Sequence, residues 1–177
     1  MTIHTFLGTV VRACILSAGV LANELSAQTT SPAASPWYRR SRTLDITGSN
    51  PRDSIVLTAT GKRGDSLAIA MTFYVAGSMV HRQKWTSEDE LADADALRAS
   101  PARLAAFMRA RLDTVLLLVK RERINAEQVR HMGDVTLLRK IVPAPTHQIS
   151  LSFGFENSLY FVWNRTSRRL TLFMECC

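Results

Sequence analysis

Two neighbouring cysteines, Cys176 and Cys177, are the most unusual chemical feature of the sequence. Adjacent cysteines can close a strained disulfide, and strained, exposed disulfides are readily reduced. As thiolates the pair suits a soft metal, and it could instead link two chains. The structural alternative is that Cys176 completes the buried face of a last strand, because it follows Leu170, Leu172 and Met174 at intervals of two residues. The pair is therefore a candidate disulfide or thiol site.

A single carboxylate, Glu156, follows the apolar tripeptide Phe153-Gly154-Phe155. Burial in an apolar cleft raises the pKa of a carboxyl group and suits it to act as a general acid. Paired with one of the histidines His81, His131 or His147, Glu156 would support a small exported hydrolase. The alternative is a solvated carboxylate in a hairpin turn.

Basic residues form two clusters, one near each end of the sequence that follows the leader. The sequence has 22 lysines and arginines against 15 acidic residues, which gives a net charge of +7. The first cluster follows Trp37 and Tyr38, and the second lies close to the last strand. The six residues are Arg39, Arg40, Arg42, Arg165, Arg168 and Arg169. Because guanidinium groups bind phosphate and carboxylate in a planar, bidentate way, clusters that meet in space would form an anion-binding surface. Solvated surface charge is the alternative.

Several classes of site lack their signatures in this sequence. There is no His-x-x-x-His or Cys-x-x-Cys spacing for zinc, no Gly-x-Ser-x-Gly nucleophile and no glycine-rich phosphate loop. The acidic run Glu88, Asp89, Glu90, Asp93 and Asp95 lacks the glycine and the final glutamate of a calcium loop. The sequence therefore favours a protein without enzymatic activity, and predicts no metal, no cofactor and no specific nucleic-acid partner.

Residues 1–27 have the pattern of a secretory signal. Two apolar runs, 6–11 and 13–22, are separated by Arg12, and Ala27 is a small residue at the expected cleavage point. A membrane anchor needs about 20 apolar residues, and Arg12 interrupts this segment too early. We expect export to the periplasm, the cell envelope or the medium, with no transmembrane helix after cleavage. A retained N-terminal anchor is the alternative.

The remaining chain divides into a tether and one domain. Residues 28–42 are rich in Ser, Thr, Ala and Pro and then become basic, which is typical of a flexible tether. Residues 43–177 are predicted to form a single domain. Once Cys14 is removed with the signal, only the adjacent cysteines remain, so the domain must be stabilised by its core rather than by a long-range disulfide.

Hydrophobic periodicity predicts strands, then helices, then strands. Alternation indicates strands at 44–47, 54–60, 67–75 and 79–85, and again at 149–155, 159–163 and 170–176. Between them, a capping box at Ser87 predicts a helix to Leu97, Ser100-Pro101 begins a longer helix, and 125–142 holds helical pieces broken at Gly133-Asp134. This order predicts an α+β fold, with an antiparallel sheet of about six or seven strands and a central helical insertion packed on one face.

Charge and the missing catalytic signatures together favour one function. We expect an exported, non-enzymatic binding module that contacts an anionic envelope component or a protein partner through its basic surface. The alternative is a small hydrolase or thiol-redox protein that uses Glu156 or the terminal cysteines.

Overall fold

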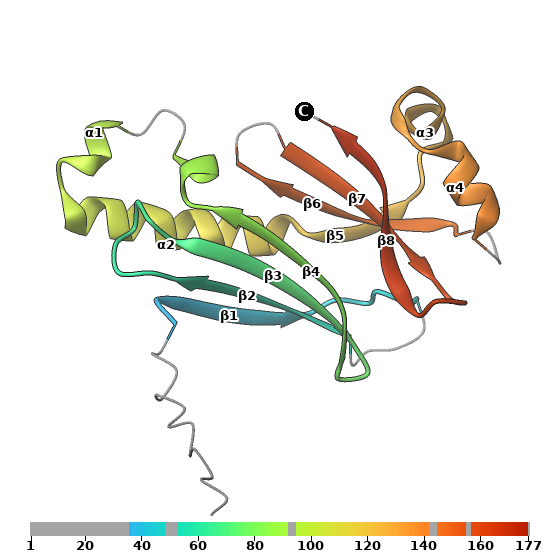
Figure 1. The fold of residues 1–177 in the computed structure, drawn as a ribbon, viewed down its shortest axis with the longest axis horizontal. Helices are drawn as coiled ribbons and strands as arrows, with labels where there is room; N and C mark the ends of the chain where they lie inside the picture. The colour runs from blue at the N-terminus through green and yellow to red at the C-terminus, as the bar shows by residue number, and fades with distance from the viewer. Residues whose placement is uncertain (1–35, 49–52, 92–94, 142–144, 155–156, 177) are drawn as a thin grey trace, which may run out of the picture. The chain divides into compact units, whose positions relative to one another are not determined.

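The chain forms two antiparallel sheets and a small number of helices (Figure 1). The computed structural model describes residues 36–48, 53–91, 95–141, 145–154 and 157–176. Within these residues each sheet has four strands, in the orders β1-β2-β3-β4 and β5-β6-β7-β8. The predicted α+β class and antiparallel pairing are confirmed. The prediction of one sheet with six or seven strands is wrong.

The N-terminal sheet is a meander in which each strand pairs with the next. Its strands are β1 (Tyr38–Thr43), β2 (Ser54–Thr60), β3 (Ala68–Val75) and β4 (Ser78–Thr86). Alternating residues of β2 are buried, as expected for a strand with one face on the core. The first strand lies in the basic segment that the sequence assigned to the tether, while residues 44–47, predicted as a strand, form a loop.

The C-terminal sheet is built from β5 (Lys120–Arg123), β6 (His147–Phe153), β7 (Asn157–Asn164) and β8 (Arg169–Cys176). Two short helices, α3 (Ala126–Met132) and α4 (Val135–Lys140), connect β5 to β6. They pack on the outer face of this sheet, in a small core that includes Val129, Val162 and Phe173. The predicted break at Gly133-Asp134 is confirmed, since the Asp134 side chain accepts a hydrogen bond from the Leu137 amide at 2.8 Å.

Three helical segments connect the sheets: η1 (Glu88–Glu90), α1 (Asp95–Arg98) and α2 (Pro101–Leu118). The long helix begins at Pro101, as the sequence predicts. The helix predicted from Ser87 to Leu97 begins instead as a 3-10 turn, and α1 covers its end, while 92–94 lie outside the described residues. Ser87 does not cap the 3-10 turn, because its hydroxyl accepts a hydrogen bond from the Leu67 amide at 2.9 Å. The Ser87 hydroxyl therefore binds the buried Leu67 amide instead of an amide at the start of the helical turn.

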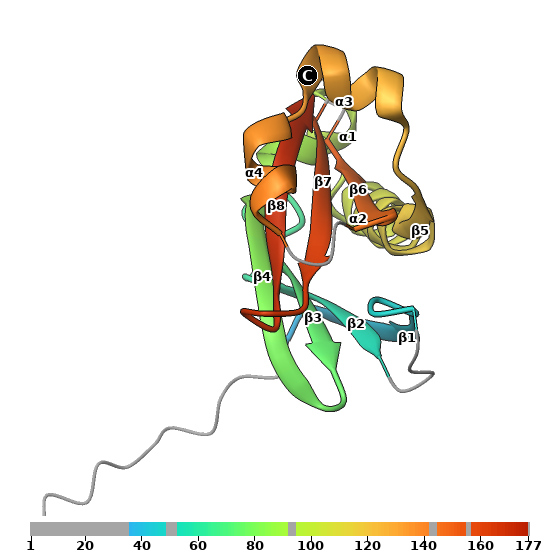
Figure 2. The same cartoon turned by 90° about the vertical axis from the view of Figure 1, so that its right-hand side faces the viewer.

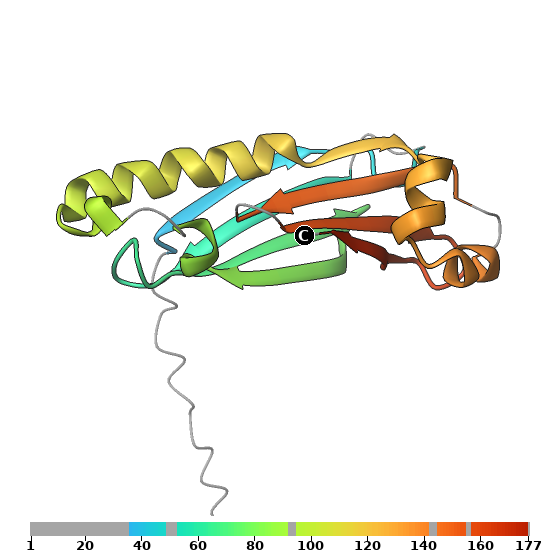
Figure 3. The ribbon, with the colours of Figure 1, turned by 90° about the horizontal axis from the view of Figure 1, so that it is seen from above.

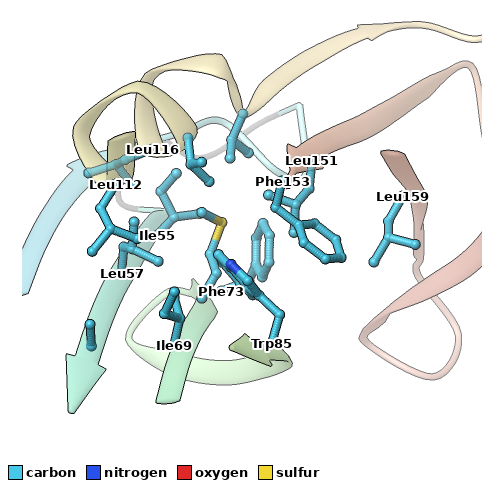
Figure 4. Packing of buried hydrophobic residues seen from close by; sticks show 14 of the residues in the cluster. Ile55, Leu57, Ile69, Phe73, Trp85, Leu112, Leu116, Leu151, Phe153 and Leu159 are labelled. Atoms are coloured by element: carbon cyan, nitrogen blue, oxygen red, sulfur yellow. The ribbon is translucent and has the colours of Figure 1, made fainter. Parts of the chain in front are cut away.

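The main core fills the space between the two sheets and α2 (Figure 4). Trp85 of the N-terminal sheet packs on Phe153 of the C-terminal sheet, with ring centroids 4.9 Å apart. Phe73 and Phe161 make a second contact between the sheets at 6.0 Å. Tilted ring pairs at these separations are favourable beyond the area that they bury. These aromatic contacts hold the inner faces of the two sheets together.

Helix α2 connects the two sheets and closes one side of the core between them. It lies along β1 and β6, on one side of the main core (Figures 2 and 3). On the other side β4 contacts β8 without pairing with it. The chain leaves the first sheet through this helix, and the next strand, β5, pairs with β6 rather than with a strand of the first sheet.

A buried ion pair fixes α2 to the strands around it. Glu90 is fully buried, and its carboxylate accepts hydrogen bonds from Trp85 Nε1 at 2.9 Å and from Arg111 Nε at 2.8 Å. Arg111 also donates through Nη2 to the carbonyl of Gly154, just after β6. A buried charge is tolerated only when it is paired and hydrogen-bonded, so these contacts define one position for the helix.

Replacing Arg111 with methionine leaves the Glu90 carboxylate buried without its cation. We expect Arg111→Met to lower the free energy of unfolding by about 3–5 kcal/mol, measured by urea titration. Adding Glu90→Gln should recover part of that loss, because it removes the uncompensated charge. Arg103→Met, on an exposed position of the same helix, is the control and should change stability by less than about 0.5 kcal/mol. Equal effects of the two arginine substitutions would contradict this account.

A partly buried histidine beside the main core makes the stability sensitive to pH. His81 packs against the rings of Phe73 and Phe161, with ring centroids 5.9 and 4.6 Å away. Desolvation in this position lowers the pKa of His81 below its usual value. The unfolded chain therefore binds a proton more readily than the folded protein does, and protonation favours unfolding.

The free energy of unfolding should therefore fall as pH decreases from about 7 to about 5. The variant His81→Leu removes this titrating group, so its unfolding free energy should fall less over the same range. Urea titrations of both proteins at several pH values measure the difference. Identical pH dependence of the two proteins would show that His81 makes no contribution.

Candidate anion-binding site

A pocket of about 170 Å³ opens at one end of the space between the sheets. Four segments that are distant in sequence supply its walls: the loop after β1, strand β5, the start of β6, and the end of β7 with the turn that follows it. The lining residues are Ile46, Thr47, Arg121, Pro145, Thr146, His147, Trp163 and Arg165. Two guanidinium groups, an imidazole and an indole thus face one small space.

A buried carboxylate shapes the loop after β1. Asp53 is fully buried, and its Oδ2 accepts hydrogen bonds at 3.1 Å from the amides of Ile46 and Thr47 and from the Thr47 hydroxyl. The amide of Gly48 donates to Asp45 Oδ1 at 2.7 Å. These contacts satisfy backbone donors that have no strand partner. They hold one wall of the pocket in place.

Arg121 is the central cation of the pocket. It lies on β5 opposite Ile149, and alternation along this strand turns it toward the inner face of the sheet, away from Lys120 and Glu122. Its Nε is buried without a hydrogen-bond partner in the described structure. Its nearest carboxylate oxygen is Asp45 Oδ2, at 3.8 Å from Nη1. A buried donor without a partner costs free energy, and an anion in the pocket would satisfy it.

His147, Arg165 and the indole ring of Trp163 complete the walls. His147 pairs with Arg123 on β5, and its Nδ1 lies 2.9 Å from the Thr146 hydroxyl. Arg165 follows β7 in a turn. The Asn164 side chain shapes this turn by accepting hydrogen bonds from the amides of Thr166 and Ser167. Among the described residues, no carboxylate pairs with Arg165. Its charge is therefore available to a ligand.

The surroundings of His147 in the pocket affect the pKa of its imidazole. Partial desolvation lowers the pKa of His147, and the charges of Arg121 and Arg123 lower it further, while Asp45 acts in the opposite direction. Near neutral pH the imidazole is then uncharged and can donate or accept a hydrogen bond. A bound anion would counter the arginine charges and favour its protonated form.

The first predicted arginine cluster lies along β1, and its members point in two directions. Arg39 is exposed on the outer face of the N-terminal sheet. Arg40 and Arg42 are on the opposite face with Tyr38, toward α2. Arg40 Nε is 3.8 Å from Asp113 Oδ1, and Arg42 is half-buried, which lowers the pKa of its guanidinium through desolvation.

The second cluster lies in the turn between β7 and β8. The structure brings Arg165 to Ile46 and Thr47, which follow β1, and so places one member of the cluster in the pocket. Arg168 and Arg169 are exposed, and Arg169 is the first residue of β8. Neither lines the pocket.

The remaining predicted sites lie at or beyond the edges of the described structure. Cys176 is the last residue of β8 and is partly buried, whereas Cys177 lies outside the described residues. Glu156 also lies outside them. The structure thus leaves the thiol and hydrolase hypotheses as predictions.

Sequence reasoning missed Arg121 and the role of the loop at 46–47. In the sequence, Lys120 to Arg123 continue the basic pattern of the residues before them, which is typical of the polar side of a helix. The available signal was the alternation of Arg121 with Arg123 next to a β-branched Val119, which favours a strand. Nothing local in the sequence links these positions to residues 147 and 165.

The chain matches no protein-family model, no curated protein and no solved structure. Across the described ranges, no helix combines the length and apolar character that a membrane crossing requires. Among the same residues, no group of three His, Cys, Asp or Glu side chains is placed to hold a metal ion. The site must therefore be interpreted from its own geometry.

Gly48 keeps open the space that Arg121 occupies. Its φ is +81°, and a Cβ at this position would lie 2.6 Å from Arg121 Nη2. Gly77, in the turn between β3 and β4, has a nearly equal φ of +82°, yet a Cβ there would meet no atom within 4 Å. The two glycines therefore share one backbone conformation and differ in their surroundings.

We expect Gly77→Ala to lower the free energy of unfolding by about 1–2 kcal/mol, the cost of the left-handed conformation. Gly48→Ala should lower it further, because it also displaces the Arg121 guanidinium. Urea titration of both variants measures the difference. Equal destabilisation would mean that Arg121 does not pack against Gly48.

Proposed function

We propose that this protein is an exported, non-enzymatic module that binds a small anionic group in the pocket formed by Arg121, His147 and Arg165. The buried, unpartnered Nε of Arg121 is the observation that carries the proposal. Desolvating a guanidinium without satisfying its donors is unfavourable in a site that has no ligand. The site has the charge and the hydrogen-bond donors to bind a phosphate, sulfate or carboxylate group.

The composition of the walls supports an anion attached to a larger molecule. The pocket is small, and the indole of Trp163 and the side chain of Ile46 provide apolar surface beside the guanidinium groups. Ligand sites usually combine apolar walls with a few polar groups that fix orientation. We infer that the charged group binds between Arg121 and Arg165 and that a short apolar or ring-shaped part lies against Trp163.

Export remains part of the proposal and is supported by the apolar segment at 6–22 and by Ala27. A pocket for anions, together with a net charge of +7, suits a location where anionic envelope components are present.

Sulfate is the appropriate probe, because its charge does not change between about pH 5 and 8, where histidine titrates. Calorimetric titration of the protein with sulfate should detect binding. Arg121→Met and Arg165→Met should each weaken it by about ten-fold or more, which corresponds to the loss of one charge-assisted contact. Arg168→Met removes the same charge from the same turn but does not line the pocket, so it should change the affinity by less than about two-fold.

The affinity for sulfate should also depend on pH. Because the pKa of His147 is lowered in the free protein, binding should strengthen as pH falls below about 6.5 and the imidazole gains a charge. In His147→Gln this increase should disappear. Equal losses of affinity in Arg121→Met and Arg168→Met would refute the proposed pocket and indicate non-specific charge attraction.

A further inference from the structure

The outer face of the N-terminal sheet is uncovered by any described helix (Figures 1 and 2). Strand pairing places its outward side chains in four rows that cross the sheet. The first row is Arg39, Thr58, Ala70 and Lys84, the second is Ser41, Val56, Thr72 and Arg82, the third is Thr60, Ala68 and Thr86, and the fourth is Thr43, Ser54, Tyr74 and Met79. Three of these side chains are basic and none is acidic.

The basic residues stand at both edges of this face. Arg82 and Lys84 are exposed on β4. Their Cα atoms are about 7 Å apart, because one residue of the strand separates them. Arg39 is exposed on β1, about 14 Å from Lys84 across three strand spacings. No carboxylate of the described structure is within ion-pair distance of any of the three. Their positive charges are therefore not neutralised by the protein itself.

A shallow groove lies between these edges because the central side chains are small. It has a volume of about 260 Å³, and Thr58, Thr60, Ala68, Ala70, Arg82 and Lys84 are among its lining residues. The hydroxyls of Thr58 and Thr60 donate to the carbonyls of Ala70 and Ala68, at 3.3 and 3.4 Å. Their oxygen atoms then remain available as acceptors for a ligand.

We propose that this face binds an acidic polysaccharide that crosses the sheet from β4 toward β1. Such a chain carries carboxylate or sulfate groups, which complement Arg82, Lys84 and Arg39, and sugar hydroxyls, which donate to the free lone pairs of Thr58 and Thr60. A single-stranded nucleic acid fits less well, because such ligands bind largely by base stacking and the one aromatic side chain among the described residues of these rows, Tyr74, does not line the groove. This surface does not share residues with the pocket around Arg121.

The test compares the intact protein with two double variants of equal charge. Arg82→Ser/Lys84→Ser removes the β4 bases. Arg130→Ser/Arg139→Ser removes two exposed bases from α3 and α4 and is the matched control. Binding of labelled polygalacturonate and of labelled dextran sulfate is followed by fluorescence anisotropy, and urea unfolding verifies that each variant is folded. The two polymers distinguish carboxylate from sulfate as the acidic group.

We expect the β4 variant to bind the preferred polymer at least about ten-fold more weakly, and the control variant to stay within about two-fold of the original protein. The β4 substitutions should cause the same loss of binding in an Arg121→Met background, which separates this surface from the proposed pocket. An equal loss of affinity in both double variants would overturn the proposal. So would a protein that binds neither of the two polymers. Tighter binding of a single-stranded oligonucleotide than of both polysaccharides would also overturn it.

Discussion

The buried contact between Glu90 and Arg111 determines where the second half of the chain begins. It connects η1, α2 and the residue after β6 through one carboxylate and one guanidinium. Because α2 ends at Leu118 and β5 begins at Lys120, the position of the helix also sets the position of Arg121. An apolar substitute could stabilise such a site as well as an ion pair does. The charged pair also fixes the orientation of the helix, since its hydrogen bonds are satisfied in one arrangement of helix and strands.

The cationic pocket is the clearest departure from an arrangement that favours stability alone. It brings two arginines and a histidine to one small space, with Asp45 as the carboxylate nearest to Arg121. Desolvation is the main reason that the pKa of His147 is lowered, and repulsion from Arg121 and Arg123 lowers it further. Asp53 holds the adjoining loop, and Gly48 leaves room for the guanidinium. Unfavourable repulsion and desolvation of charged groups are typical of sites that are completed by a ligand.

Some of this structure could be predicted from the sequence, and the failures have physical causes. Strand β3 was predictable because one face is continuously buried. Strand β1 was not, because Arg40 and Arg42 lie on the side that faces α2 and conceal the alternation. Residues 120–123 are all charged and become a strand only by pairing with β6, which is a tertiary effect. Of the pocket residues, only Arg165 belonged to the predicted anion-binding surface, and His147 was a candidate for the alternative hydrolase alone, because strand pairing and not spacing in the sequence brings the pocket residues together.

The most direct test of the cationic pocket is to locate a bound anion in a crystal. Selenate has the shape and charge of sulfate, and its selenium atom gives an anomalous signal that marks its position. We predict a selenium peak within hydrogen-bond distance of the guanidinium groups of both Arg121 and Arg165. Selenate found at other surface arginines, with none in this pocket, would contradict the assignment.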